Sequence, residues 1–212
     1  MVGWVPADGT RHAGELSYLS VVGSLEATGD RLELEARQRG LDPARDRVVC
    51  LADGAPGNWA HLAAHFAQRV EALDWWHAVE HLWAAANGVF GEGTDAATRW
   101  VAARTARLWE GRVDLVRRAL QRAARMAGGA AAAAELAYFT TNAARMNYGA
   151  FRAAGYPIAS GMVESACKRV IGARAKQAGM QWTRLGAQAV LTLRAELLSD
   201  RWEDSWPLTR PA

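Results

Sequence analysis

The sequence predicts a mixed α/β fold, and two observations support this prediction. Three short stretches rich in β-prone residues come early, at residues 2–5, 16–23 and 47–55. From there the pattern becomes more helical, and residues 94–154 are helical throughout, with interruptions only at glycines. A chain of 212 residues is long enough to bury a real core as one domain, or as one domain with an insertion.

The third β-prone stretch, "RVVCLADGA", is the most informative of the three. It is an apolar run that ends in Asp53-Gly54, which is typical of a buried strand that carries an acid to its carboxyl end. Strand ends at this edge of an α/β sheet are where ligand and metal groups tend to be exposed. An Asp-Gly pair is also a common turn, so both interpretations remain open at this point.

The elements between residues 24 and 91 alternate between helix and strand. Gly40 stops the first predicted helix, and Pro56 opens the second. Asp74 stands in a position to cap the helix that follows it. The predicted elements are a helix at 26–40, a helix continuing through 58–70, a short strand at 70–74 and an amphipathic helix at 75–91.

The second half of the chain is predicted to be entirely helical. An alanine-rich tract at 127–134 reads as a turn that leads into a helix. The Tyr156-Pro157 pair breaks the helical pattern. Ser160 then fits the N-cap of a helix over 161–176, and the last helix is expected at 184–200.

Composition narrows the class of protein. No run of about 18 apolar residues suggests a membrane span, and the first residues lack the order of a secretory signal. Cys50 and Cys167 form no Cys-x-x-Cys motif and imply no disulfide framework. We therefore expect a cytoplasmic, reduced protein without a membrane partner.

Charge is distributed unevenly along the chain, whose formal net charge is +3. Between residues 141 and 194, Glu164 is the only acid among eight basic residues. This asymmetry favours a polyanionic partner, most simply nucleic acid, although GC-rich coding also enriches Ala and Arg. The residues expected to contact DNA are Arg145, Arg152, Lys168, Arg169, Arg174, Lys176 and Trp182.

Glu164 lies early on the predicted helix, where the positive helix terminus tolerates a carboxylate. Lys168 is four residues further on, so a plain ion pair on one helix face is one interpretation. Apolar neighbours such as Val163 and Ile171 indicate that the helix is packed, and a carboxylate near a core requires a reason. A metal-binding or catalytic role is the alternative.

A second motif lies in "LDWWHAVEHLW". His77, Glu80 and His81 form an H-x-x-E-H string, the zinc-binding pattern of inverted zinc peptidases when it lies on a helix. His61 and His65 make another pair with the same spacing, so the string is not unique in this chain. A zinc peptidase is thus one alternative function.

The chain contains 10 tryptophans, which is unusually many for its length. Trp182 follows the basic helix and either stacks on a nucleotide or anchors a core. The others at helix positions are predicted to pack in the core: Trp59, Trp75, Trp76, Trp83, Trp100 and Trp109.

Several of these strings occur together in one order, and together they resemble a known family. The strings are "VVCLADGAPGNWAHLAAHF", "LDWWHAVEHLW", "YPIASGMVESACKRVIGARAKQAGMQWT" and "GAQAVLTLRAELLSDRWEDSW". They resemble the C-terminal catalytic portion of bacterial insertion-sequence transposases of the ISKra type. These are DDE enzymes, and the resemblance implies an RNase H-like α/β fold with a helical insertion before the glutamate helix.

The resemblance also implies roles for particular residues. Asp53 matches the second catalytic aspartate and Glu164 the catalytic glutamate, and these two would hold Mg²⁺ or Mn²⁺. Asp74 and His77 match the Asp-x-x-His signature of this and related groups. The intact enzymes cleave and join double-stranded DNA, at transposon ends and target, and we expect a homo-oligomer in the active complex at the nucleoid.

The expected organisation follows from the same resemblance. Residues 1–93 would form the N-terminal part of the RNase H-like core, 94–154 the insertion, 155–206 the C-terminal helices and 207–212 a tail. The family's first aspartate is expected upstream of Met1, because Asp8 reads as a hairpin turn. The sheet would then be incomplete at its N-terminus, and this chain impaired or inactive. A non-catalytic DNA-binding module is the other alternative.

Overall fold

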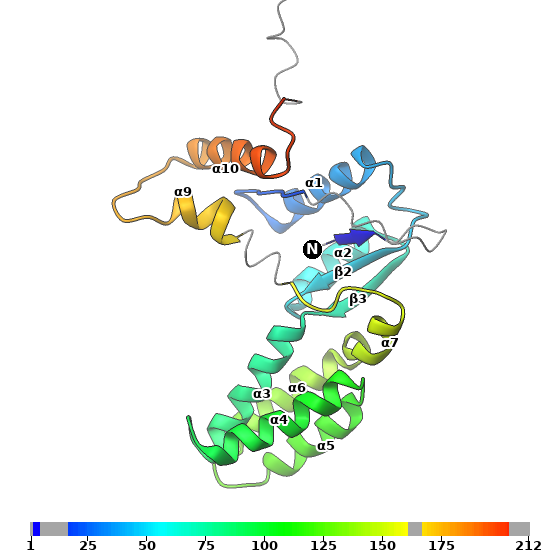
Figure 1. Ribbon diagram of the computed structural model, residues 1–212, viewed down its shortest axis with the longest axis vertical. Coiled ribbons are helices and arrows are strands. Elements are labelled where there is room, and N and C mark those ends of the chain that lie inside the picture. The colour runs from blue at the N-terminus through cyan, green and yellow to red at the C-terminus, as the bar shows by residue number, and fades with distance from the viewer. Residues whose placement is uncertain (1, 5–16, 161–166, 204–212) are drawn as a thin grey trace, which may run out of the picture. The chain divides into compact units, whose positions relative to one another are not determined.

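The computed structural model describes residues 2–4, 17–160 and 167–203 (Figure 1). The protein is mixed α/β and mostly helical. No helix in the described ranges combines the length and the apolarity needed to span a bilayer. The chain divides into two compact units: unit 1 comprises Met1–Gly3, Val49–Trp59 and Val70–Ser160, and unit 2 comprises Trp4–Val48, Ala60–Arg69 and Gly161–Ala212.

A small sheet has the strand order β1 (Val2–Trp4), β2 (Val48–Ala52), β3 (Arg69–Leu73). Strands β2 and β3 are parallel, because backbone hydrogen bonds run from Val48 N to Gln68 O at one end and from Asp74 N to Ala52 O at the other, at 3.0 and 2.8 Å. Helix α2 (Pro56–His65) connects them. Residues 48–51 are buried, so the predicted buried strand is confirmed, as are the strand predicted at 70–74 and, over the described residues 2–4, the one predicted at 2–5.

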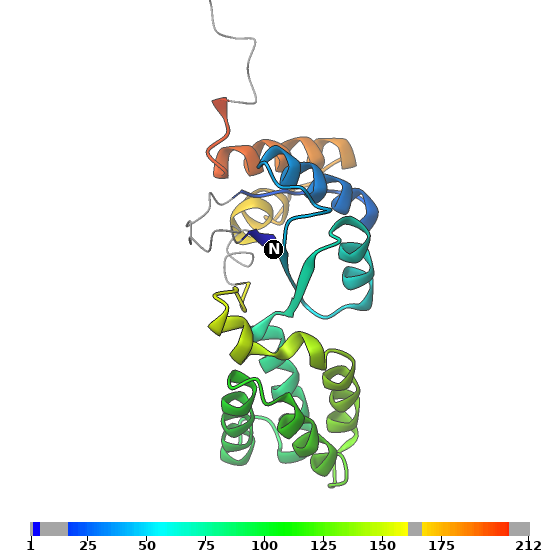
Figure 2. The ribbon, with the colours of Figure 1, turned by 90° about the vertical axis from the view of Figure 1, so that its right-hand side faces the viewer.

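Unit 1 contains a bundle of helices that Figures 1 and 2 show packed side by side. The bundle confirms the predicted helical pattern of residues 94–154, including the turn before residue 130. The helix at residues 75–90 packs on the helices at 95–109 and 130–141, although the sequence grouped it with the N-terminal core section. The bundle helices are α3 (Trp75–Phe90), α4 (Asp95–Trp109), α5 (Val113–Ala123) and α6 (Ala130–Thr141), followed by a 3₁₀ turn, Ala143–Met146, and α7 (Tyr148–Ala153).

Local signals explain where these helices begin and end. The Thr94 hydroxyl accepts a hydrogen bond from Ala97 N at 3.1 Å and so caps α4. Helix α3 ends at Gly91, whose φ of 88° favours glycine. In the core, the Trp75 ring meets the rings of Trp109 and Tyr148 edge-on, with centroids 5.2 and 5.1 Å apart.

The prediction that six tryptophans pack in the core is only partly right. Trp59 and Trp75 are buried, but the exposed fractions of Trp76 and Trp109 are 56% and 44%. Trp76 follows Trp75 on a helix, so it points about 100° away around the axis, toward solvent. The Trp109 ring is covered on one face by the Arg152 guanidinium, 3.8 Å from the ring centroid, rather than by apolar side chains alone.

Unit 2 is built on two long helices, α1 (Leu25–Gln38) and α10 (Arg184–Leu198), which confirm the predicted first and last helices. Residues 161–166 lie outside the described residues, so the start of the predicted helix 161–176 and its capping by Ser160 stay predictions. Residues Cys167–Gly172 form a π-helix and Ala173–Ala175 (α9) a single α-helical turn.

The predicted strand at 16–23 is wrong for the described residues 17–23, which form no strand. Side chains of α10 and of the residue after it bind this segment's backbone instead. Gln188 accepts a hydrogen bond from Val22 N at 2.6 Å and donates to Ser20 O at 2.9 Å. Ser199 Oγ accepts from Tyr18 N at 2.8 Å. Because these backbone groups find partners on a helix, the segment has no need of a neighbouring strand.

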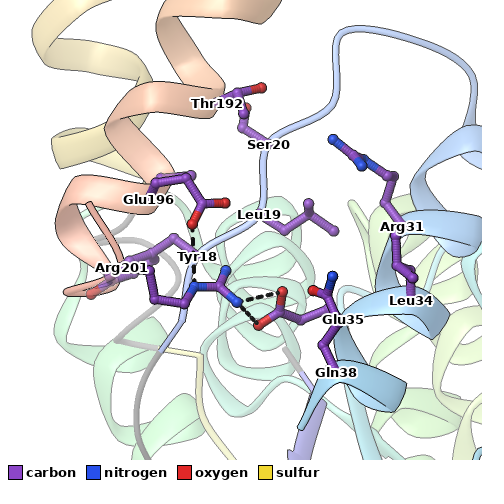
Figure 3. Close-up of a pocket in the computed structure, with 11 residues that line it drawn as sticks. Tyr18, Leu19, Ser20, Arg31, Leu34, Glu35, Gln38, Thr192, Glu196 and Arg201 are labelled. Carbon is purple, nitrogen blue, oxygen red and sulfur yellow. Dashed lines mark hydrogen bonds and ion pairs between the residues drawn. The ribbon is translucent and has the colours of Figure 1, made fainter. Parts of the chain in front are cut away.

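A small cavity of about 110 Å³ lies in unit 2 between residues 18–20, α1 and the end of α10 (Figure 3). Arg201 reaches between Glu35 and Glu196, with contacts of 3.1 and 3.3 Å. Burial tends to raise the pKa of Glu35, but hydrogen bonds from Ser17, Arg39 and Arg201 outweigh it and hold the pKa below its ordinary value. This ion network joins the C-terminal part of the unit to α1.

Candidate active site

Asp53 directly follows strand β2, and its side chain is exposed. Its Oδ1 accepts two hydrogen bonds, from Ala55 N at 3.0 Å and from Asn58 Nδ2 at 2.9 Å. These bonds orient the carboxylate, while Oδ2 meets no hydrogen-bond donor among the described residues. An exposed, oriented acid at the carboxyl end of a buried parallel strand is well placed to bind a ligand or a cation.

Gly54 shapes the turn that carries Asp53. Its φ is 92°, and a Cβ there would lie 2.6 Å from the Tyr138 hydroxyl oxygen and 2.7 Å from Leu73 Cδ1. The Tyr138 hydroxyl donates a hydrogen bond to Asp53 O at 2.8 Å. Helix α6 therefore contacts the sheet edge here, and any larger residue at position 54 would push it away.

Asp74 follows the adjacent strand β3 but is only 1% exposed. Its Oδ1 accepts from Trp76 N and His77 N at 2.9 and 3.2 Å, which confirms the predicted helix cap. Its Oδ2 accepts from Ser160 N at 2.5 Å. Burial tends to raise the pKa of Asp74, but the hydrogen bonds from Ser160 and His77 outweigh burial and hold the pKa below its ordinary value of 3.8.

His77 lies beside Asp74, as the Asp-x-x-His spacing predicts. Its Nδ1 is 3.2 Å from Asp74 Oδ1, and its side chain is 44% exposed. With a proton on Nδ1 this contact is a hydrogen bond to the carboxylate, so the buried aspartate orients the imidazole ring.

After the helical bundle, the chain returns to the start of α3, beside Asp74. Trp75 N donates to Ile158 O at 2.8 Å, and the bond from Ser160 N to Asp74 spans 86 residues of sequence. Ser160 is the last described residue before 161–166, the segment that contains Glu164. Glu164 itself lies outside the described residues, so its convergence with Asp53 stays a prediction.

A second histidine of the H-x-x-E-H string is engaged elsewhere. His81 Nδ1 lies 2.6 Å from Glu135 Oε2, and the His81 ring stacks on Tyr138 with centroids 3.6 Å apart. Burial and the negative charges of neighbouring acids, Asp53 first among them, raise the pKa of Tyr138. Across residues 17–160 and 167–203, no group of three or more His, Cys, Asp or Glu side chains is arranged to hold a metal ion.

The basic residues predicted to contact DNA fall into both units. Arg145, in unit 1, is turned toward its own unit: its Nε is 2.6 Å from Glu71 Oε2 and its guanidinium lies 4.5 Å from the Trp59 ring centroid. Arg152 donates to Trp109 O at 3.0 Å and is exposed. Both therefore have a packing role in unit 1, whatever else they bind.

The remaining predicted DNA contacts lie in unit 2 and are exposed: Lys168, Arg169, Arg174, Lys176 and Trp182. The first two belong to the π-helix, a rare geometry that is frequent at functional sites. The Arg194 guanidinium donates to Arg169 O and so holds this π-helix against α10.

The sequence analysis did not predict the contacts that three residues make in the site. Asn58 lies only five residues after Asp53, in the first turn of α2, so the spacing was a signal that could have been used. Ser160 was predicted as a cap rather than as the partner of Asp74. Tyr138 is 85 residues from Asp53, and nothing local to it indicates this contact.

No protein-family model matches the chain, and no curated protein or solved structure matches it either. The motifs, and the geometry around Asp53 and Asp74, are what support a function.

Proposed function

We propose that this chain carries a nucleotidyl-transfer site of an RNase H-like DNA transposase of the ISKra type, which cleaves transposon-end DNA and joins it to a target. The observation that carries the proposal is the exposed Asp53 carboxylate, oriented at the carboxyl end of buried strand β2. The motif that ends in Glu164 supplies the second acid.

The path of the chain supports a meeting of the two acids. The helices between β3 and residue 158 leave from the sheet edge and return to it, since Trp75 N binds Ile158 O. Ser160 is anchored on Asp74, and Glu164 follows it by four residues, which an extended chain spans in about 14 Å. Asp53 and Glu164 can therefore lie close together in space, although more than a hundred residues separate them in the sequence.

The donor set suits the expected metal. Asp53 and Glu164 would hold Mg²⁺ or Mn²⁺, which prefer carboxylate oxygens and retain several waters, and Asp53 keeps Oδ2 clear of donors among the described residues. When bound, such ions activate a hydroxyl nucleophile and stabilise the leaving oxygen.

Other residues position the catalytic side chains or bind the DNA. Asn58 fixes the Asp53 carboxylate, and Asp74 holds both His77 and Ser160. Because both of its oxygens already accept hydrogen bonds, Asp74 acts as a positioning residue and not as a metal ligand. The exposed basic residues of unit 2 would hold the phosphates of the DNA.

The proposal is tested by Mn²⁺ binding and by cleavage of transposon-end DNA. We expect Asp53→Asn and Glu164→Gln each to weaken Mn²⁺ binding and to abolish metal-dependent cleavage. Asp95→Asn removes an exposed acid from α4 and serves as the matched control, with no effect on either readout. Unchanged Mn²⁺ binding in both active-site variants would rule out the proposed site. Unchanged DNA affinity without any metal dependence would favour a non-catalytic DNA-binding module.

A further inference from the structure

A groove of about 290 Å³ lies along helices α4 and α5, inside unit 1. Its floor includes the buried residues Val116 and Ala119. Its rim is formed by four arginines and by no acidic residue: Arg104, Arg107, Arg118 and Arg122. None of the four was among the expected DNA contacts. Figure 1 shows the two helices next to each other in the bundle.

The arginines of this groove are poorly neutralised by the protein itself. Arg107 pairs with Glu110 at 3.0 Å and Arg118 with Asp114 at 4.0 Å, and both are exposed pairs on a single helix, which contribute little. Arg122 has no acidic partner among the described residues. The groove therefore concentrates positive charge that its exposed acidic neighbours balance only in part.

Arg104 shows the effect of this crowding. Partial burial, and then the positive charge of Arg122, lower the pKa of Arg104 below its ordinary value. The Arg104 guanidinium is held in place because it lies 4.6 Å from the Trp100 ring centroid and donates to Trp100 O at 3.3 Å. Two like charges on neighbouring helices are thus kept close together, and an anion between them would relieve their repulsion.

We propose that the α4–α5 groove binds the phosphate backbone of a nucleic acid. Guanidinium groups present planar forks that match phosphate oxygens in a bidentate way. An acidic peptide would need backbone partners or side-chain pockets for its recognition, and the apolar floor offers neither. Contacts of this kind position a duplex without reading its sequence. The groove is separate from Asp53, and its binding does not depend on the metal chemistry proposed there.

Fluorescence anisotropy with a short labelled DNA duplex of mixed sequence, in EDTA, tests this assignment. The affinity is measured between about 50 and 200 mM salt. The test variant is Arg104→Gln/Arg122→Gln. The matched control is Arg99→Gln/Arg125→Gln, which removes the same charge from exposed positions on or next to the same helices but outside the groove.

We expect the test variant to lose affinity by on the order of tenfold for each lost contact. Its plot of log affinity against log salt should become shallower by about 2. The control should keep nearly the wild-type slope. Arg118→Gln, at a side chain that is 67% exposed, should lower the slope by about 1 without any risk to folding.

Three outcomes would overturn the assignment. One is an equal loss in the test and control variants, which would mean that only general charge matters. The second is no duplex binding by the wild-type protein. The third is groove-dependent binding of a polyglutamate peptide in preference to DNA. Loss of cleavage in the Asp53 variant with binding in EDTA intact would separate this groove from the proposed catalytic site.

Discussion

Asp53 and Asp74 follow adjacent parallel strands, yet their surroundings differ completely. Asp53 is exposed, and hydrogen bonds from Ala55 and Asn58 hold only its Oδ1. Asp74 is 1% exposed, and both of its oxygens accept hydrogen bonds. One aspartate keeps an oxygen to offer to a ligand, while the other uses both of its oxygens to cap α3 and to anchor Ser160.

A position at the end of a strand therefore does not by itself decide whether an aspartate can bind a ligand. The sequence motifs placed both aspartates among the expected catalytic residues. Burial and hydrogen bonding distinguish the two acids. The Asp53 carboxylate faces solvent, whereas the Asp74 carboxylate is buried and holds the residues around it in place. The two roles predict opposite effects of substitution on activity and on stability.

The largest expected effect is that of Asp53→Asn on catalysis. We expect any Mn²⁺-dependent DNA cleavage that the wild-type chain retains to fall by at least about 100-fold, because a charged ligand is lost where charge must be stabilised. The free energy of unfolding should stay within about 0.5 kcal/mol of the wild type, since the side chain is exposed. A cleavage time course measures the loss of activity, and urea unfolding measures the stability. Marked destabilisation of Asp53→Asn would contradict the proposed difference between Asp53 and Asp74.

Asp74→Ala should lower the free energy of unfolding by about 3 kcal/mol. It removes the α3 cap and leaves the Ser160 amide without its partner. Thr94→Ala is the control, because it removes an ordinary helix cap and should cost about 1 kcal/mol. Urea denaturation measures both, and an equal cost for the two variants would show that the Ser160 contact adds nothing.

The lowered pKa of Asp74 predicts a pH dependence. Its folded-state pKa lies below its ordinary value of 3.8, so its contribution to stability is complete above that value and is lost as the pH falls through the folded-state pKa. The difference in stability between the wild type and Asp74→Asn should therefore shrink as the pH is lowered below about 4. A difference that stays constant down to pH ~2 would contradict the ionised state of Asp74.

Tyr138→Phe is the smallest expected change. It removes the hydrogen bond to Asp53 O and should cost about 1 kcal/mol. Tyr156→Phe is the control, because its hydroxyl makes no hydrogen bond within the described residues. Thermal unfolding compares the two variants. An unchanged melting temperature for Tyr138→Phe would mean that packing against Gly54, and not the hydrogen bond, holds α6 at the turn.

Much of the fold could be read from local patterns. The apolar run within residues 47–55 predicted strand β2, and the amphipathic pattern after Asp74 predicted α3. Helical stretches at 26–40, which Gly40 stops, and at 184–200 predicted α1 and α10. The strand predicted at 16–23 failed because side chains of α10 satisfy its backbone hydrogen-bonding groups, and Gln188 lies 166 residues away from Val22. The prediction that Trp76 packs in the core was wrong because consecutive residues of a helix lie on different faces.

Local sequence patterns were enough to predict the strand end at Asp53, the cap at Asp74 and the basic character of residues 141–194. Such features arise from periodicity and capping, which act over a few residues. Three features are visible only in the folded protein: Tyr138 binds the Asp53 turn, Ser160 returns to Asp74, and four arginines of α4 and α5 share one groove. These contacts join segments that are distant in sequence, and packing of whole helices is what brings them together.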